Sequence, residues 1–310
     1  MGTIASLSDL DHARFPARLA IAKQVMADFE NRISIFKDDS EISRINQAAG
    51  HHPVKVSPET FDLLRMARRY AELSEGTFEP TVLPMVQLWG FNRGKLPSAL
   101  PAADAVRRAK EHVGWQHLVL TNGEAFLEKE GMSLDLGGLK GYAADVCWNR
   151  IREDGGTNFL VDLAGNMRCA GNPRPGDSWK IGVRNPFERE EILGVLRMTS
   201  GMAVATSGNY ERFVEIEGRR YGHIMDPRNG RPVEGMAGVT VLSDSAGEAD
   251  ALCKPMFILG PEGSRALRRK VPHCEVIFIP DIQPPKILIT PGLKDRFTPL
   301  PEYTNNVVML

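Results

Sequence analysis

The apolar residues in the first third of the chain recur at the spacing of α-helices. One broad apolar face runs from about Pro16 to Ile35. The next candidate helix has Ser57 as its N-cap and Pro58 at its first helical position, and it stops at Gly76. A third covers roughly residues 102–113. The pattern therefore predicts three helices before residue 117.

From residue 117 onward the apolar spacing changes to that of β-strands. Asn122-Gly123 and Glu217-Gly218 each lie between short apolar runs, which is typical of a β-hairpin. Two further helices are expected, at about Tyr142–Ile151 and at about Gly247–Leu259, the second closed by Gly260. The predicted strands are His117–Leu120, Ala125–Leu127, Met132–Leu136, Asn158–Leu163, Trp179–Val183, Leu193–Met198, Met202–Thr206, Arg212–Ile216, Arg220–Ile224, Val239–Leu242, Glu275–Ile279 and Lys286–Ile289.

Helices and strands alternate here without the regular order of a doubly wound sheet. This mixture favours an α+β fold with mainly antiparallel sheets. No linker of biased composition and no short-period repeat divides the chain. We therefore expect one catalytic domain over residues 1–310, within which two closely packed lobes can be accommodated.

The composition excludes several classes of function. A net charge of −1 gives no basic field for nucleic acid, so nucleic-acid binding is not expected. No apolar run approaches the ~20 residues of a membrane-spanning helix. The first residues have neither the basic start nor the apolar core of an export signal. The expected compartment is the cytoplasm for the sequence as it stands, or the periplasm if a leader was removed.

The four cysteines show no metal-binding or redox spacing. Cys147, Cys169, Cys253 and Cys274 form no CxxC pair. A chain of 310 residues can bury a sufficient core without disulfides. We therefore expect four small, partly buried, structural side chains.

Five polar segments could carry chemistry, although each has an ordinary structural explanation. The Asp135–Gly141 loop places glycines and Lys140 before a helix, where backbone N–H groups can meet phosphate, but it matches no established phosphate-binding motif. The loops at residues 164–166 and 206–209 are rich in small residues, as turns are. His223 stands in a charged stretch at a strand end, and Asp250 suits the first turn of a helix. Taken singly, none of these identifies a function.

Taken together and in order, the segments resemble the ApbE family of FAD:protein FMN transferases. Eight ordered blocks are more specific than any single one, and the resemblance extends to about residue 290. The blocks are Met1-Gly2-Thr3, Ser40-Glu41-Ile42-Ser43-Arg44-Ile45-Asn46, Gly76-Thr77-Phe78-Glu79-Pro80-Thr81-Val82, Leu88-Trp89-Gly90-Phe91, the Asp135 loop, Thr206-Ser207-Gly208-Asn209-Tyr210, His223-Ile224-Met225-Asp226-Pro227-Arg228, and Ala249-Asp250-Ala251-Leu252 with Phe257-Ile258-Leu259-Gly260.

The resemblance implies that FAD binds between two lobes of an ApbE-like fold. It also implies a divalent cation, usually Mg²⁺, held at the positions of Gly138 and Asp250 and by a threonine hydroxyl at position 254. Oxygen ligands suit such a hard cation. Trp89 would support the flavin wall from behind. The residues that would bind FAD are Met1, Phe36, Thr77, Phe78, Glu79, Asp135, Lys140, His223 and Ile224.

The implied reaction is the transfer of FMN to a protein hydroxyl. A serine or threonine of an acceptor flavoprotein attacks the FMN-side phosphorus of FAD, and AMP leaves. Cations must neutralise the charge that accumulates on the phosphate oxygens. His223 is the candidate base for the hydroxyl proton. His223 and Asp250 are therefore the predicted catalytic residues.

The chain departs from the family pattern at three important places. Lys254 replaces the threonine, and a protonated lysine has no lone pair for a metal. Only Leu139 separates Gly138 from Lys140, one residue fewer than in the family. Glu79 stands where aspartate is usual. Ala164, in place of a glycine, is a minor change.

Two interpretations of Lys254 follow with equal weight. Either position 254 drifted in a protein that lost its activity, or the ammonium group sits where the metal would be, near Asp250 or a FAD phosphate. Mg²⁺ is therefore doubtful here. The functional hypotheses are an FMN transferase, a FAD-binding protein without transferase activity, and a FAD pyrophosphatase in which water replaces the acceptor hydroxyl.

Overall fold

The computed structural model describes residues 5–92, 99–188, 190–210 and 212–310. The chain divides into two compact units. The first comprises residues 1–27, 139–208 and 235–310, and the second comprises residues 28–138 and 209–234. The division falls inside helix α1 (Phe15–Ile33). Among the described residues, no helix has the length and apolar character needed to cross a bilayer.

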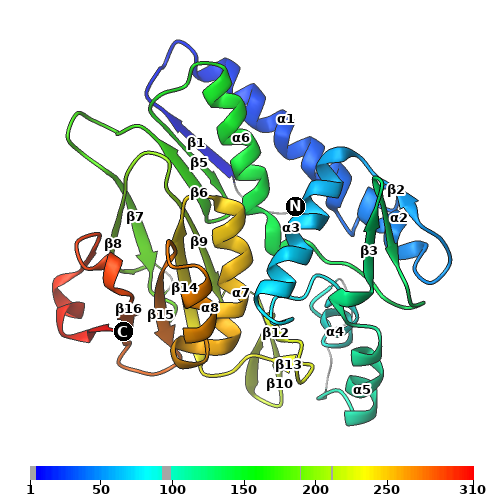
Figure 1. Ribbon diagram of the computed structural model, residues 1–310. Coiled ribbons are helices and arrows are strands. Elements are labelled where there is room, and N and C mark those ends of the chain that lie inside the picture. The colour runs from blue at the N-terminus through cyan, green and yellow to red at the C-terminus, as the bar shows by residue number, and fades with distance from the viewer. Residues whose placement is uncertain (1–4, 93–98, 189, 211) are drawn as a thin grey trace. The chain divides into compact units, whose positions relative to one another are not determined.

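The first unit is built on an eight-stranded sheet in the order β1-β5-β6-β9-β14-β15-β16-β18 (Figure 1). Neighbouring strands are antiparallel except for β16 and β18, which are parallel. The strands are β1 (Ala5–Asp9), β5 (Phe159–Leu163), β6 (Asn166–Ala170), β9 (Ala203–Gly208), β14 (Met236–Ser243), β15 (Glu275–Pro280), β16 (Ile287–Ile289) and β18 (Val307–Met309).

Different elements cover the two faces of this sheet. Helices α6 (Gly141–Glu153) and α7 (Ala246–Gly263) pack on one face (Figure 1). A small sheet of β17 (Phe297–Pro299), β8 (Ile192–Met198) and β7 (Trp179–Arg184) packs against Val204 and Ile277 of the large sheet. Because strand side chains alternate between faces, the central strands contribute to the packing on both faces of the sheet. Helix α8 (Arg265–Lys270) follows α7.

The second unit is mainly helical. It contains α2 (Glu41–Gln47), α3 (Pro58–Leu73), α4 (Leu83–Leu88) and α5 (Ala103–Glu111). Its strands form a small sheet of β2 (Val54–Lys55), β4 (Glu124–Leu127) and β3 (Leu118–Thr121), and two hairpins, β10 (Phe213–Ile216) with β11 (Arg219–Gly222) and β12 (Met225–Asp226) with β13 (Arg231–Pro232). Met85 and Trp89 of α4 share one apolar cluster with Val214 and Tyr221 of the first hairpin.

The structure confirms the predicted α+β class and most of the predicted elements. Ser57 caps α3, Asn122 and Gly123 connect β3 to β4, and α7 loses helical geometry at Gly260 (φ 66°, ψ −177°). The predicted strand at Met132–Leu136 is wrong, because this segment has only an isolated bridge between Ser133 and Val82. Strands β1, β2, β6, β12, β13, β17 and β18 and helices α2, α4 and α8 were not predicted.

Candidate functional site

The loop at residues 77–79 is fixed by the end of α3. The Ser74 hydroxyl donates to the Tyr70 carbonyl (2.7 Å) and accepts from the N–H of Phe78 (2.9 Å). The Thr77 N–H donates to the Ser74 carbonyl (3.1 Å). Thr77 and Phe78 are both buried. The loop therefore has a defined backbone before any ligand is present.

Glu79 directs its carboxylate into its own loop. One oxygen accepts from the N–H and the hydroxyl of Thr81 (2.9 and 2.7 Å), and the other accepts from the N–H of Trp115 (3.1 Å). Burial raises the pKa of Glu79, although these donors lower it in part. Its carboxylate thus holds the loop together.

The structure brings Asp135 beside this loop. The Asp135 N–H donates to the Pro80 carbonyl (2.9 Å). The Asn46 side-chain oxygen accepts from the Leu134 N–H (2.7 Å), and its amide donates to the Leu134 carbonyl (3.1 Å). An Asp135 side-chain oxygen accepts from the Gly137 N–H (2.8 Å). Asn46, which the sequence reasoning did not assign to the site, therefore positions the Asp135 turn.

His223 follows β11 and is held by the carbonyl of Arg212. Both the N–H and the Nδ1 of His223 lie within hydrogen-bonding distance of that oxygen (3.1 and 3.2 Å). The Arg212 guanidinium in turn donates to the Phe91 carbonyl. His223 is half-buried. Because a carbonyl can only accept, a hydrogen bond from the ring to this oxygen requires a proton on Nδ1, which in the neutral imidazole leaves Nε2 as the acceptor nitrogen.

The remaining residues that the resemblance singled out each have their own surroundings. Ile224 is buried, and its carbonyl accepts from the Val233 N–H (2.9 Å). Phe36, between α1 and α2, exposes 41% of its surface, which is unusual for a large apolar side chain. Trp89 is buried and donates its ring N–H to the Gly230 carbonyl (3.0 Å). Met1 lies outside the described residues.

In the first unit, the start of α6 meets the first turns of α7. The Gly141 N–H donates to one Asp250 oxygen (3.0 Å). A Cβ at position 141 would lie 2.0 Å from the Ala246 carbonyl oxygen, so only glycine fits there. The two helix starts are therefore in direct contact, and Asp250 lies buried between them.

Lys254 pairs with the other side-chain oxygen of Asp250. Its ammonium group forms an ion pair with that oxygen and also donates to the Asp250 backbone carbonyl (3.3 Å). Burial acts to raise the pKa of Asp250, but the charges of Lys254 and Lys140 and the Gly141 N–H lower it on balance. Asp250 is thus held as a carboxylate by two lysines and one helix N-terminus.

Asp145, which the sequence analysis missed, fixes the start of α7. Its carboxylate accepts from the Ser245 hydroxyl (2.7 Å) and from the N–H groups of Ala246 and Gly247 (3.0 and 2.8 Å), and it pairs with Arg168 (2.8 Å). A carboxylate at a helix N-terminus is favourable. The capping pattern from Ser245 to Glu248 marks the helix start, but nothing in the sequence links it to α6.

The side chains of Asp250 and Lys254 do not fit a magnesium ion. Mg²⁺ requires oxygen ligands with available lone pairs in near-octahedral geometry. Here both Asp250 side-chain oxygens already accept hydrogen bonds, and an ammonium group takes the place of the third predicted ligand. The metal positions Gly138 and Asp250 therefore remain a prediction from the resemblance alone.

The four cysteines are free and buried, as expected. Burial raises the pKa of each thiol to about 12. Such thiols stay protonated near neutral pH, so they are poor nucleophiles. They do not compete with His223 and Asp250 as catalytic candidates.

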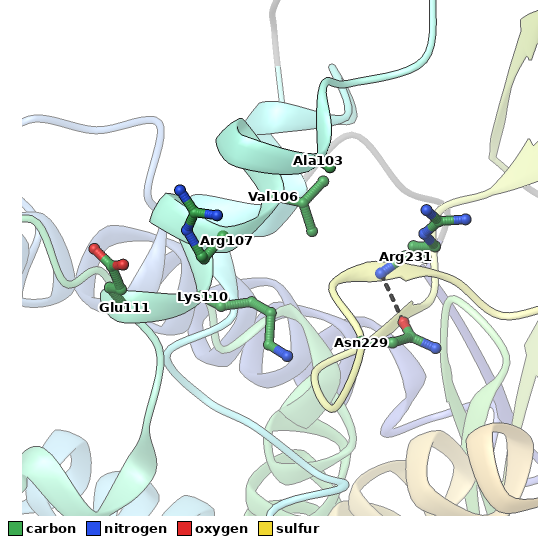
Figure 2. Close-up of a pocket in the computed structure, with 7 residues that line it drawn as sticks. All are labelled: Ala103, Val106, Arg107, Lys110, Glu111, Asn229 and Arg231. Atoms are coloured by element: carbon green, nitrogen blue, oxygen red, sulfur yellow. Dashed lines mark hydrogen bonds between the residues drawn. The ribbon is translucent and has the colours of Figure 1, made fainter.

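A hollow of about 430 Å³ lies elsewhere in the second unit, between α5 and the β12–β13 turn (Figure 2). None of the predicted site residues lines it. Lys110 donates to the Arg228 carbonyl (2.6 Å), and Arg107 pairs with Asp104 (3.0 Å), so these two cations of the lining already have partners. The lining residues are Ala103, Val106, Arg107, Lys110, Glu111, Asn229 and Arg231.

Comparisons with known proteins agree on one family. The model of the ApbE family matches residues 1–278. The FAD:protein FMN transferase of Klebsiella pneumoniae is 33% identical over 279 residues, which cover 87% of this chain and 79% of that protein. The enzyme of the same name from Treponema pallidum is 33% identical over 285 residues, covering 85% and 76%.

Solved structures give the same result. The flavin transferase ApbE of Vibrio cholerae superimposes with a TM-score of 0.85 at 27% identity, covering 96% of both chains. The ApbE protein of Thermotoga maritima reaches the same TM-score at 29% identity, covering 95% of this chain and 96% of that one. The similarity therefore includes the fold as well as the sequence.

Proposed function

This chain belongs to the ApbE family, and we propose that it transfers FMN from FAD to a serine or threonine hydroxyl of an acceptor flavoprotein. The observation that carries the proposal is similarity over most of the chain to proteins named FAD:protein FMN transferase. The fixed loops around Glu79 and Asp135, His223 on its carbonyl, and Asp250 at the α6–α7 contact support it.

In the proposed reaction, one bond forms and one breaks at phosphorus. The acceptor oxygen bonds to the FMN-side phosphorus, the bond between that phosphorus and the bridging oxygen breaks, and AMP leaves with the bridging oxygen. The proton of the acceptor hydroxyl goes to Nε2 of His223, whose Nδ1–H is held by the Arg212 carbonyl. The backbone therefore selects the tautomer that a general base requires.

The proposed FAD contacts fall into two kinds. Phe36 exposes apolar surface that the flavin can contact, whereas the buried Phe78 and Ile224 are assigned to the wall of the pocket. Lys140 brings positive charge near the α6 N-terminus, where phosphate binds favourably. Asp135 shapes its turn through the Gly137 N–H. We assign Thr77 and Glu79 to the shape of the neighbouring loop.

The test is to incubate the purified protein with FAD and acceptor flavoprotein domains that each carry a single target threonine. Covalent labelling is measured by flavin fluorescence in a denaturing gel and by mass spectrometry, with the Thr→Val acceptor as control. We expect labelling of the threonine form only, with AMP released in equal amount. FAD that is bound but unchanged would instead support a flavin-holding protein. FMN and AMP released without labelling would support a pyrophosphatase.

A further inference from the structure

Two lysines and one carboxylate meet where α6 begins. Asp250 is nearly fully buried (side-chain exposure 4%), whereas Lys254 keeps 25% of its side chain exposed. The charge of Lys140 also acts on Asp250. Lys254 pairs with the buried carboxylate and, because it is partly exposed, brings its positive charge toward the surface.

The surroundings add to this preference for an anion. Lys254 and Asp250 are one turn apart on α7, so the Asp250 carboxylate fixes the position of the Lys254 ammonium group. Helix α6 is 13 residues long, and its N-terminus points at the same group through the Gly141 N–H. One oxygen of Asp250 accepts from the Gly141 N–H and the other pairs with the Lys254 ammonium group, whose positive charge opposes a metal ion at this carboxylate.

We infer that Lys254, positioned by Asp250, is the cation that contacts the pyrophosphate of FAD, so that this chain handles the pyrophosphate without a divalent ion. The inference rests on the proposed function for the identity of the ligand. Lys254 keeps its proton throughout and neutralises charge on the phosphate oxygens as the phosphorus–oxygen bond breaks. Asp250 acts through Lys254 and is a positioning residue.

The first experiment measures binding of FAD and of riboflavin by calorimetry, with EDTA or with Mg²⁺. The variants are Lys254→Met, which keeps the stem and loses the charge, and Lys254→Arg, which keeps the charge. Lys286→Met, at an exposed lysine of the same unit, is the matched control. Riboflavin lacks phosphate, so it reports the flavin pocket alone.

We expect FAD affinity to be equal within twofold in EDTA and in Mg²⁺. Hydrogen bonds to charged groups contribute enough that Lys254→Met should weaken FAD binding by about 10- to 100-fold. Riboflavin binding should change less than twofold, Lys254→Arg should retain most of the affinity, and Lys286→Met should match the parent. An unchanged FAD affinity in Lys254→Met would overturn the inference, as would a tenfold gain in parental affinity from Mg²⁺.

Lys254→Met also leaves Asp250 buried without its partner, which can destabilise the fold. The double variant Asp250→Asn/Lys254→Met removes both charges, and it should show the same loss of FAD affinity with a melting temperature closer to the parent. Recovery of FAD affinity in the double variant would overturn the inference, because the loss would then come from the stranded carboxylate.

A transfer assay separates this inference from the proposed function. Labelling of the acceptor that persists in EDTA supports both. Labelling that EDTA abolishes and Mg²⁺ restores overturns the inference and leaves the proposed transfer intact. Lys254-dependent FAD binding without any labelling supports the lysine contact and counts against the transferase.

Discussion

The ion pair of Asp250 and Lys254 shows how one side chain can change the chemistry of a buried carboxylate. The two residues are four apart on α7, so a helix must place them on one face. A threonine at position 254 would add a hydroxyl oxygen there, whereas the lysine adds a permanent positive charge. A second cation would be repelled: at ~4 Å and an effective dielectric constant near 20, a pair of unit charges costs about 4 kcal/mol, and a divalent ion roughly doubles this.

Lys254→Thr alone is therefore predicted not to restore full Mg²⁺ binding. It removes the repulsion, but the turn from Gly138 to Lys140 still lacks one residue relative to the family. It also removes the ion-pair partner of the buried Asp250 carboxylate, which should lower the free energy of unfolding by about 1–3 kcal/mol. This cost is smaller than for a fully buried ion pair because Lys254 is partly exposed. Calorimetric titration of Mg²⁺ into the FAD complex and urea unfolding measure both effects. Tight Mg²⁺ binding by this single variant would contradict the prediction.

His223→Ala is predicted to keep FAD binding and to lose transfer. A general base typically contributes about 10²–10⁴-fold to a rate, and His223 is only half-buried, so its removal should disturb the fold little. The measurements are FAD affinity by calorimetry and the rate of acceptor labelling. His52→Ala, at an exposed histidine of the same unit, is the control. Labelling at the parental rate would mean that another group takes the proton.

The sequence could predict some residue positions and not others. The contact of Asp250 with Lys254 follows from helix geometry alone. The inward orientation of Glu79 does not, because one of its partners, Trp115, is 36 residues away. Asp145 likewise acts on residues about 100 positions later. Side-chain roles set by such distant donors leave no local pattern in the sequence.

At the level of elements, the segment at residues 132–136 shows where periodicity misleads. Met132, Leu134 and Leu136 alternate with polar residues and are buried, as in a half-buried strand. The backbone of Leu134, however, pairs with the Asn46 side chain instead of a neighbouring strand. Alternation of apolar and polar residues indicates that one face of a segment is buried. It does not show which groups accept or donate the hydrogen bonds of the segment's backbone.

Asn46→Ala is therefore predicted to destabilise the second unit and weaken FAD binding. It removes two hydrogen bonds and leaves the buried N–H and carbonyl of Leu134 unsatisfied, which should cost about 2–4 kcal/mol of unfolding free energy. The adjacent Gln47→Ala loses one exposed bond to the Asp38 carbonyl and should cost less than about 1 kcal/mol. Chemical denaturation compares the two. Equal stability of both variants would show that Asn46 does not hold the Asp135 turn.

The start of α7 gives a second prediction at this scale. Asp145→Ala removes the carboxylate that accepts from Ser245, Ala246 and Gly247. Loss of a helix N-terminal cap costs about 0.5–2 kcal/mol, and the unpaired Arg168 adds to it. Hydrogen exchange should show faster opening of the first turn of α7 in this variant. Glu153→Ala, at an exposed acid near the end of the same α6, is the control, and protection equal to the parent would refute the role of Asp145.

For the whole molecule, the order of elements along the chain was enough to predict the α+β class, but the division into units was not visible in it. Residues 209–234 return to the second unit after one long stretch of the first, residues 139–208. The large sheet places β9 between β6 and β14, so its central pairings join strands more than 30 residues apart. Such pairings depend on packing of complete faces, and local periodicity contains no information about them.

The last prediction concerns the whole ligand: the protein should bind FAD more tightly than FMN. Compared with FMN, FAD has a second phosphate and an adenosine. The described chain offers the positive charges of Lys140 and Lys254. It also offers the loop at residues 77–79, whose shape is fixed by hydrogen bonds to Ser74 and Glu79. A pre-formed loop binds without the full cost of ordering it. Calorimetry with FAD, FMN, riboflavin and AMP in EDTA measures the preference. FAD should be the tightest, and AMP should bind weakly but detectably. Equal affinities for FAD, FMN and riboflavin would show that the AMP half makes no contact, and the donor half of the proposed reaction would then lack its binding site.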